Sequence, residues 1–176
     1  MTRLAEMAEA FGGIRTVLIG AQAANRYMPS RATMDTDFAV AAEDADVIEA
    51  ALREHRWTLN GRLAMTGMTG TAWVTDANEQ VDVVYLPLKW GKEAIASARE
   101  DPVLGVRVVT LAFLVLMKLL AARSKDTGDI EELLINKSRR QLESVRHTVM
   151  RYGRVDDLED LDQIIKLAGW RAEPRL

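Results

Sequence analysis

Residues 17–40 constrain the fold of this chain more than any other stretch of the sequence. A short apolar run ends at Ile19 and leads into Gly20, after which small and unbranched residues favour a helix over residues 21–28 that Pro29 ends. We therefore expect a strand over residues 15–19, a tight turn and a helix N-terminus. Free backbone N–H groups and the positive end of a helix dipole at such a turn suit a phosphate.

The second half of this stretch holds two acids with one residue between them, Asp35 and Asp37, on a predicted strand that continues to residue 40. Side chains at positions i and i+2 of a strand share a face, so the two carboxylates are expected to stand side by side. Two anions that close repel each other unless a positive charge lies between them. A hard divalent cation, Mg²⁺ or Mn²⁺, takes such oxygen ligands, and the pattern predicts Asp35 and Asp37 as metal ligands.

A third acid, Asp82, interrupts the apolar and β-branched run of the predicted strand 80–86. An unpaired carboxylate inside a buried strand costs several kcal/mol, so Asp82 needs either a partner or a function. Two readings are open. Asp82 either joins the first two acids, or it lies at a sheet edge in contact with solvent or an arginine.

The order of these motifs resembles the active-site signature of the DNA polymerase β-type nucleotidyltransferase superfamily. More narrowly, the Gly20-Ala21 pair, a helix and the run RATMDTD at residues 31–37 resemble bacterial minimal nucleotidyltransferases related to AbiEii-type toxins. In one position the chain departs from the pattern: Ala21 stands where the superfamily usually has Gly or Ser, and Ala offers no hydroxyl to a phosphate.

The resemblance implies roles for individual residues. It makes Asp35, Asp37 and Asp82 both catalytic and metal-binding. It also implies nucleotide contacts, on the loop before the acids, from Gly20, Ala21, Arg31 and Thr33.

A second part of the resemblance lies in the C-terminal third. The predicted buried helix 111–123 carries one interior charge, Lys118, and Lys125, Asp126 and Asp129 follow in the Lys-Asp-x-x-Asp pattern of the AbiEii-related proteins. The resemblance gives Lys118 a catalytic role and both lysines to the nucleotide phosphates, with Asp126 or Asp129 orienting them or the acceptor. The alternative is that the last three are ordinary helix-end charges. An unbroken helix would align Lys118, Lys125 and Asp129, whereas Gly128 can break it.

The remaining patterns predict an α+β protein with the nucleotidyltransferase fold, a small mixed β-sheet flanked by helices with a C-terminal helical part. We expect a sheet domain over residues 1–109 and a helical part over 110–176 packed on the same core. The other predicted helices are 3–11, 43–56, 90–100, 130–152 and 157–167, and the other predicted strands are 62–66, 71–75 and 103–109.

Composition bounds the class of protein. The chain is 48% hydrophobic and 28% charged and has no cysteine, which excludes disulfides and thiolate zinc sites. The longest apolar run, 108–117, is far short of the ~20 residues of a membrane span, so we expect a cytoplasmic protein and no membrane partner. A net charge of −3 argues against bulk electrostatic capture of nucleic acid. The basic residues of helix 130–152 are either a solvated face or a contact surface for RNA or an acidic partner.

The sequence therefore predicts a metal-dependent enzyme that moves a nucleoside monophosphate from a nucleoside triphosphate to a hydroxyl on tRNA, protein or a small molecule. The resemblance adds a cognate toxin or antitoxin as a partner. A nucleotide-binding protein of the same fold without turnover, such as an antitoxin-like partner, stays open. A phosphohydrolase is a third class, but there is no His-Asp metal cluster to support it.

Overall fold

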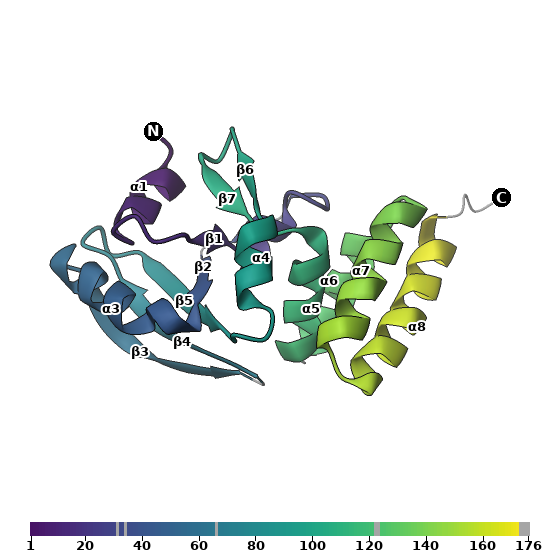
Figure 1. Cartoon of the computed structure of the whole chain (residues 1–176). Coiled ribbons are helices and arrows are strands. Elements are labelled where there is room, and N and C mark those ends of the chain that lie inside the picture. Colours follow the sequence, from purple (N-terminus) through teal and green to yellow (C-terminus); the bar gives the residue numbers. More distant parts are fainter. Residues whose placement is uncertain (31, 34, 66, 122–123, 173–176) are drawn as a thin grey trace. The chain divides into compact units, whose positions relative to one another are not determined.

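The computed structural model describes residues 1–30, 32–33, 35–65, 67–121 and 124–172, with the side chains of residues 124–126 and 170–172 left out. The predicted residue Arg31 lies outside the described residues. The chain forms two compact units, residues 1–23 with 31–110 and residues 24–30 with 111–176 (Figure 1). The segment 24–30 thus belongs with the C-terminal helices.

The first unit is built on a seven-stranded sheet with the strand order β3-β4-β5-β2-β1-β7-β6 (Figure 1). The pairs β2–β5 and β1–β7 are parallel and the other neighbours are antiparallel, so the sheet is mixed, as predicted. The strands are β1 (Val17–Leu18), β2 (Thr36–Ala41), β3 (Thr58–Met65), β4 (Met68–Val74), β5 (Gln80–Leu86), β6 (Arg99–Asp101) and β7 (Val106–Val108).

The predicted helix over residues 90–100 is wrong at its C-terminal end. Helix α4 spans Gly91–Ser97, and the chain then forms β6, which pairs with β7. The Arg107 guanidinium of β7 donates to the carbonyl oxygens of Ile95 (3.1 Å) and Ala98 (2.7 Å). A cation at the last carbonyls of a helix satisfies groups that have no partner within the helix, and Arg107 does so at the end of α4.

Helix α3 (Ala45–Glu54) follows a 3₁₀ turn, η1 (Ala42–Asp44). The spacing of Val47, Ile48, Ala51 and Leu52 predicts an amphipathic helix here, and Ile48 and Leu52 are fully buried. Val47, expected on the buried face, is 61% exposed, whereas Glu49 is only 6% exposed. The Glu49 carboxylate accepts hydrogen bonds from Arg62 of β3 and from the Tyr85 hydroxyl of β5 (3.1 Å). Burial opposes the charge, but these hydrogen bonds outweigh it and lower the pKa of Glu49. Apolar periodicity alone cannot reveal such a paired acid.

Aromatic side chains fill the core beneath α3. The ring of Phe11, which follows α1 (Arg3–Glu9), packs edge-to-face against Phe38 of β2 at 5.2 Å and Trp57 at 6.1 Å between ring centroids. Phe11 and Phe38 are fully buried. The sheet is therefore held on this face by large apolar contacts, which fixes the position of β2.

The second unit consists of the helices α5 (Leu111–Ala121), α6 (Ser124–Leu134), α7 (Arg139–Tyr152) and α8 (Val155–Ala172). The single predicted helix over residues 130–152 is wrong, because Asn136 adopts a φ of 57° and Ser138 begins α7 with a capping box that includes Gln141. Gly153 ends α7 as predicted, but α8 continues through Gly169. In the part of the chain that the structure describes, no helix is both long and apolar enough to cross a membrane.

Candidate functional site

Two of the three predicted acids lie side by side on neighbouring parallel strands. Asp37 of β2 and Asp82 of β5 are register partners, so their side chains leave the same face of the sheet. Each is partly exposed within a strand that is otherwise almost entirely buried. Strand β5 lies between β4 and β2, so the reading of Asp82 as a sheet-edge residue is wrong.

This pair lies on the sheet face opposite α3. Tyr85 bonds Glu49 of α3, and Tyr85 is three residues beyond Asp82, an odd number that reverses the face on a strand. The acids and the aromatic core are thus separated by the thickness of the sheet.

Asp35 precedes β2 by one residue and is exposed. The pKa of Asp82 is raised, chiefly because burial disfavours its charge and further because the negative charge of Asp35 is near, while a hydrogen bond from the Gln80 side chain opposes the shift. The Oδ1 atom of Asp82 is buried and has no hydrogen-bond partner among the described residues. Asp82 therefore has a buried oxygen without a partner among the described residues, and burial is the main cause of its raised pKa.

Gly20 forms a close seat for the carboxylate of Asp37. Its φ is +66°, and a Cβ added to it would lie 2.0 Å from Asp37 Oδ2 and 2.6 Å from Asp37 Cγ. No side chain fits there, and the left-handed backbone conformation also favours glycine. The Ile19 N–H donates to the Asp37 carbonyl oxygen at 2.9 Å, which holds the turn against β2.

The helix after this turn is shorter than predicted. Helix α2 spans Gly20–Ala24, and Ala24 is where the chain passes to the second unit. There Lys137 donates to the Tyr27 carbonyl oxygen at 2.6 Å. A five-residue helix has a small dipole, so any phosphate held here depends on the N–H groups of the turn rather than on the helix.

Gln22 is a residue at this site that the sequence reasoning missed. Its Nε2 donates to the Thr36 hydroxyl at 2.8 Å and to the Asp35 carbonyl oxygen at 3.2 Å. The signal in the sequence was a single polar residue among the alanines that follow Gly20. No spacing rule connects that residue to Asp35 before the fold is known.

The donor set suits a divalent cation by its chemistry. Carboxylate oxygens are the ligands that Mg²⁺ and Mn²⁺ take. The buried Oδ1 of Asp82 has no hydrogen-bond partner among the described residues, and Asp37 leaves the same face of the sheet on the neighbouring strand. With the side chains as they stand, no group of three or more His, Cys, Asp or Glu residues among those described is arranged to hold a metal ion.

The predicted residues of the second unit form a buried ion pair. Lys118 Nζ of α5 lies 2.7 Å from Asp129 Oδ2 of α6, with side chains 9% and 15% exposed. The two residues therefore meet across two helices, α5 and α6, rather than along one unbroken helix. Gly128 lies inside α6 and does not break it. The side chains of Lys125 and Asp126 lie outside the described part of the chain.

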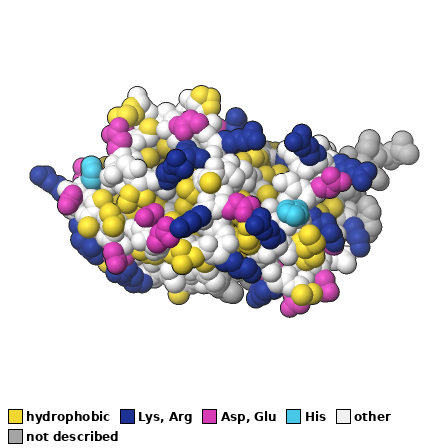
Figure 2. Space-filling model, viewed as in Figure 1, with side chains coloured by type: hydrophobic (Ala, Val, Ile, Leu, Met, Phe, Trp, Pro, Cys, Tyr) yellow, Lys and Arg dark blue, Asp and Glu magenta, His cyan; other side chains and the backbone are white. Residues whose placement is uncertain are grey.

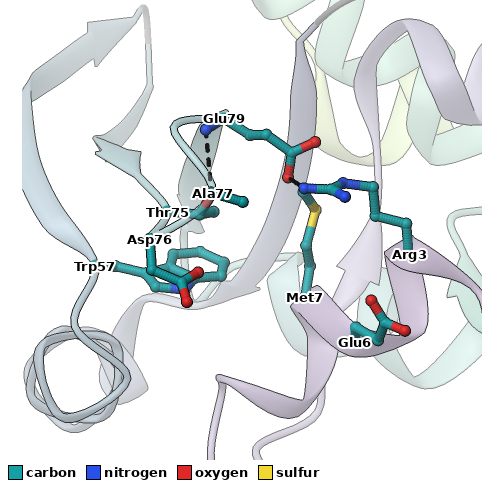
Figure 3. A pocket seen from close by; sticks show the side chains of 8 residues that line it. All are labelled: Arg3, Glu6, Met7, Trp57, Thr75, Asp76, Ala77 and Glu79. Carbon is teal, nitrogen blue, oxygen red and sulfur yellow. Dashed lines mark hydrogen bonds and ion pairs between the residues drawn. The ribbon is translucent and has the colours of Figure 1, made fainter.

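A pocket of about 190 Å³ lies elsewhere in the first unit, between α1 and the turn from β4 to β5 (Figure 3). Figure 3 shows the Arg3 guanidinium meeting the Glu79 carboxylate across it, with Trp57 behind Asp76. It contains none of the predicted site residues.

Charge on the surface is mixed. Figure 2 shows Lys and Arg side chains interspersed with Asp and Glu on the face drawn, without one large basic patch. On α7, Arg139 pairs with Glu143 and Arg146 with Asp162 of α8. These pairs are typical of a solvated helix face.

Comparisons with known proteins bear on the fold. No family model matches the sequence, and no curated protein matches it. The solution structure of the antibiotic-resistance factor ANT(2'')-Ia is similar with a TM-score of 0.50 and 15% identity, over 96% of this chain and 89% of that one. The crystal structure of ANT(2'')-Ia in complex with adenylyl-2''-tobramycin is similar with a TM-score of 0.51 and 14% identity, over 98% and 100%.

A third similar structure is the Megavirus polyadenylate synthase, with a TM-score of 0.50 and 14% identity over 85% of this chain but 36% of the synthase. At these identities the likeness shows a shared fold. The predicted fold class is confirmed: a mixed sheet flanked by helices, with the architecture of nucleotidyltransferases. The narrower relation to AbiEii-type toxins stays a prediction.

Proposed function

We propose that this protein is a metal-dependent nucleotidyltransferase, which moves a nucleoside monophosphate from a nucleoside triphosphate to a hydroxyl acceptor. The observation that carries the proposal is the pairing of Asp37 with Asp82 on adjacent strands, with Gly20 lying against the Asp37 carboxylate and Asp35 one residue before the start of β2. A buried carboxylate with an unpaired oxygen is costly to keep, and a cation offsets that cost.

In this proposal Asp35, Asp37 and Asp82 hold Mg²⁺ or Mn²⁺. The bound cation offsets the charge on the triphosphate and on the entering and leaving oxygens. The acceptor oxygen forms a bond to the α-phosphorus, the bond from that phosphorus to the bridging oxygen breaks, and pyrophosphate leaves. A bound cation would make the acceptor hydroxyl more acidic, and Asp82 is assigned to receive the proton that this hydroxyl gives up.

Other residues of the chain are assigned to the nucleotide. The N–H groups after Gly20, including that of Ala21, bind phosphate, and Arg31 and Thr33 contribute from the loop before Asp35. Lys118 and Lys125 neutralise phosphate oxygens, with Asp129 orienting Lys118 through the 2.7 Å pair.

The acceptor is a hydroxyl of tRNA, a protein or a small molecule. One similar structure contains an adenylylated small molecule, which supports a small-molecule acceptor, and another is a polyadenylate synthase, which supports an RNA acceptor in general rather than tRNA. A role beside a cognate toxin or antitoxin follows from the family resemblance alone.

One observation favours a second candidate, a nucleotide-binding protein of this fold without turnover. Ala21 removes the hydroxyl that a Ser would offer to a phosphate, which weakens binding of the leaving group without disturbing the fold. Such a protein would bind nucleotide and release no pyrophosphate.

The test is a transfer assay on the full chain with each α-labelled nucleoside triphosphate, Mg²⁺ and a cell extract separated into RNA, protein and small molecules. Wild-type protein should label one fraction and release pyrophosphate, and Asp37→Asn should do neither. Asp76→Asn, an exposed acid in the turn after β4, is the matched control and should retain activity. If the protein binds nucleotide but labels no fraction and releases no pyrophosphate, the proposed transfer activity is wrong and the nucleotide-binding protein is favoured.

A further inference from the structure

The start of β2 is held by contacts from one short segment, residues 19–22. The Ile19 N–H bonds the Asp37 carbonyl oxygen, Gly20 lies against the Asp37 carboxylate, and Gln22 bonds both Asp35 and Thr36. Three consecutive residues, 35 to 37, are therefore positioned by one turn. The two outer residues, Asp35 and Asp37, are two of the three acids of the site.

The position of Asp35 depends on these contacts from residues 19–22 more than the position of Asp37 does. Strand β2 begins at Thr36, so the ladder to β5 starts only after Asp35, at the pair Thr36 and Val81. The peptide group between Asp35 and Thr36 is oriented instead by the Gln22 side chain. An amide nitrogen carries two hydrogens, and those of Gln22 Nε2 serve the Asp35 carbonyl at 3.2 Å and the Thr36 hydroxyl at 2.8 Å.

Glutamine suits this position because it is neutral. A lysine or arginine there would orient the same peptide group, but its charge would compete with a cation for the carboxylates. Gln22 fixes the backbone that carries Asp35 and leaves the negative charge of the site intact. The Thr36 side chain is only 5% exposed, so its hydroxyl relies on this partner.

We propose that Gln22 is a positioning residue that holds Asp35 in register with Asp37 and Asp82 and thereby raises the affinity of the site for a divalent cation. The inference rests on the proposed function, since it presupposes that the three carboxylates share a cation. It assigns to Gln22 an effect on metal binding that acts through the backbone of Asp35, without contact with nucleotide.

The experiment measures Mn²⁺ binding to the full-length protein by electron paramagnetic resonance, independently of turnover. Gln22→Met keeps the length of the side chain and removes both hydrogen bonds. Loss of a residue that orients metal ligands typically weakens metal affinity about 10- to 100-fold, and we expect a loss in that range. Gln163→Met, at an exposed position on α8, is the matched control and should bind Mn²⁺ like the wild type.

A second readout separates positioning from a general structural role. In the transfer assay Gln22→Met should raise the Mg²⁺ concentration needed for half activity, while the KM for nucleotide at saturating Mg²⁺ stays unchanged. Thr36→Val should reduce the penalty of Gln22→Met in the double variant, because one of the two contacts is then already absent. If circular dichroism shows Gln22→Met to be unfolded, Gln22→Asn replaces it, with the same expected loss.

The inference predicts a loss of Mn²⁺ affinity of about 10- to 100-fold in Gln22→Met. It would be overturned if the affinity of this variant lies within about twofold of wild type. Asp37→Asn in the same titration keeps this result distinct from failure of the proposed function. If Asp37→Asn loses Mn²⁺ and Gln22→Met does not, only the role of Gln22 is wrong. If wild type and Asp37→Asn bind Mn²⁺ equally, the metal site itself is wrong.

Discussion

Replacing Gly20 by alanine tests the seat of Asp37 most sharply. Two costs arise at this position. A non-glycine residue at φ +66° costs about 1–2 kcal/mol in backbone strain. The added Cβ would also lie 2.0 Å from Asp37 Oδ2, so the carboxylate must rotate away or the turn must move.

A matched control isolates the second cost. Gly13 also has a positive φ, +81°, but a Cβ there meets nothing within 4 Å. Gly13→Ala therefore carries the backbone strain without the clash. Its melting temperature should fall by about 2–8 °C, since 1 kcal/mol shifts a domain of this size by about 2–4 °C. Gly20→Ala should fall further than Gly13→Ala.

Function should separate the two variants more clearly than stability. Misplacement of a catalytic group by about 1 Å can cost about 100-fold in rate, so Gly20→Ala should lose about that much transfer activity while Gly13→Ala retains it. Combining Gly20→Ala with Asp37→Ala removes the clash, and the double variant should be more stable than the sum of the single changes predicts. Equal melting temperatures and equal Mn²⁺ affinity in Gly20→Ala and Gly13→Ala would refute the reasoning.

Three further changes test other parts of the account. Asp82→Asn should abolish Mn²⁺ binding and raise the melting temperature of the metal-free protein at pH 7. The pKa of Asp82 is raised on folding, so the ionised carboxylate destabilises the folded state increasingly as the pH rises above the unfolded value of 3.8. The gain in melting temperature should therefore shrink at lower pH. A gain independent of pH would contradict this assignment. Lys118→Met should cost about 3 kcal/mol in urea unfolding because it leaves Asp129 buried without this cation, whereas Arg139→Met on the exposed face of α7 should cost under about 1 kcal/mol; equal costs would show that the buried pair is not structural. Tyr85→Phe should cost about 1 kcal/mol through the lost bond to Glu49. An unchanged urea midpoint would show that Arg53 and Arg62, which also bond Glu49, suffice to hold it.

Much of the first unit was predictable because its signals are local. The Gly20 turn, the strand that carries Asp37 and the lone acid in the strand 80–86 are set by spacing and by the cost of burying charge, and the structure places these three features together. The predicted strand also included Asp35, whereas β2 begins at Thr36. The sheet neighbours of Asp82 were not predictable from spacing. They depend on a parallel crossover between β2 and β5 that joins segments more than 40 residues apart.

Two of the misses have a different cause, which is pairing between side chains far apart in the sequence. Glu49 is buried because Arg62 and Tyr85 reach it, and Gln22 matters because it faces Asp35, yet neither partner is visible in local periodicity. The break between α6 and α7 has a local signal in the sequence that the prediction of one helix over residues 130–152 did not use. Ser138 and Gln141 form a capping box at the spacing that marks a helix start.

The central claim is that one cation site is shared by Asp35, Asp37 and Asp82. Its most direct test is a crystal structure of the protein with Mn²⁺ and a non-hydrolysable nucleoside triphosphate, using the anomalous scattering of manganese. The account predicts an anomalous peak bonded, at about 2.1–2.2 Å, to oxygens of these carboxylates and to phosphate oxygens. Manganese and triphosphate bound elsewhere, with Asp82 unable to reach the ion, would contradict it.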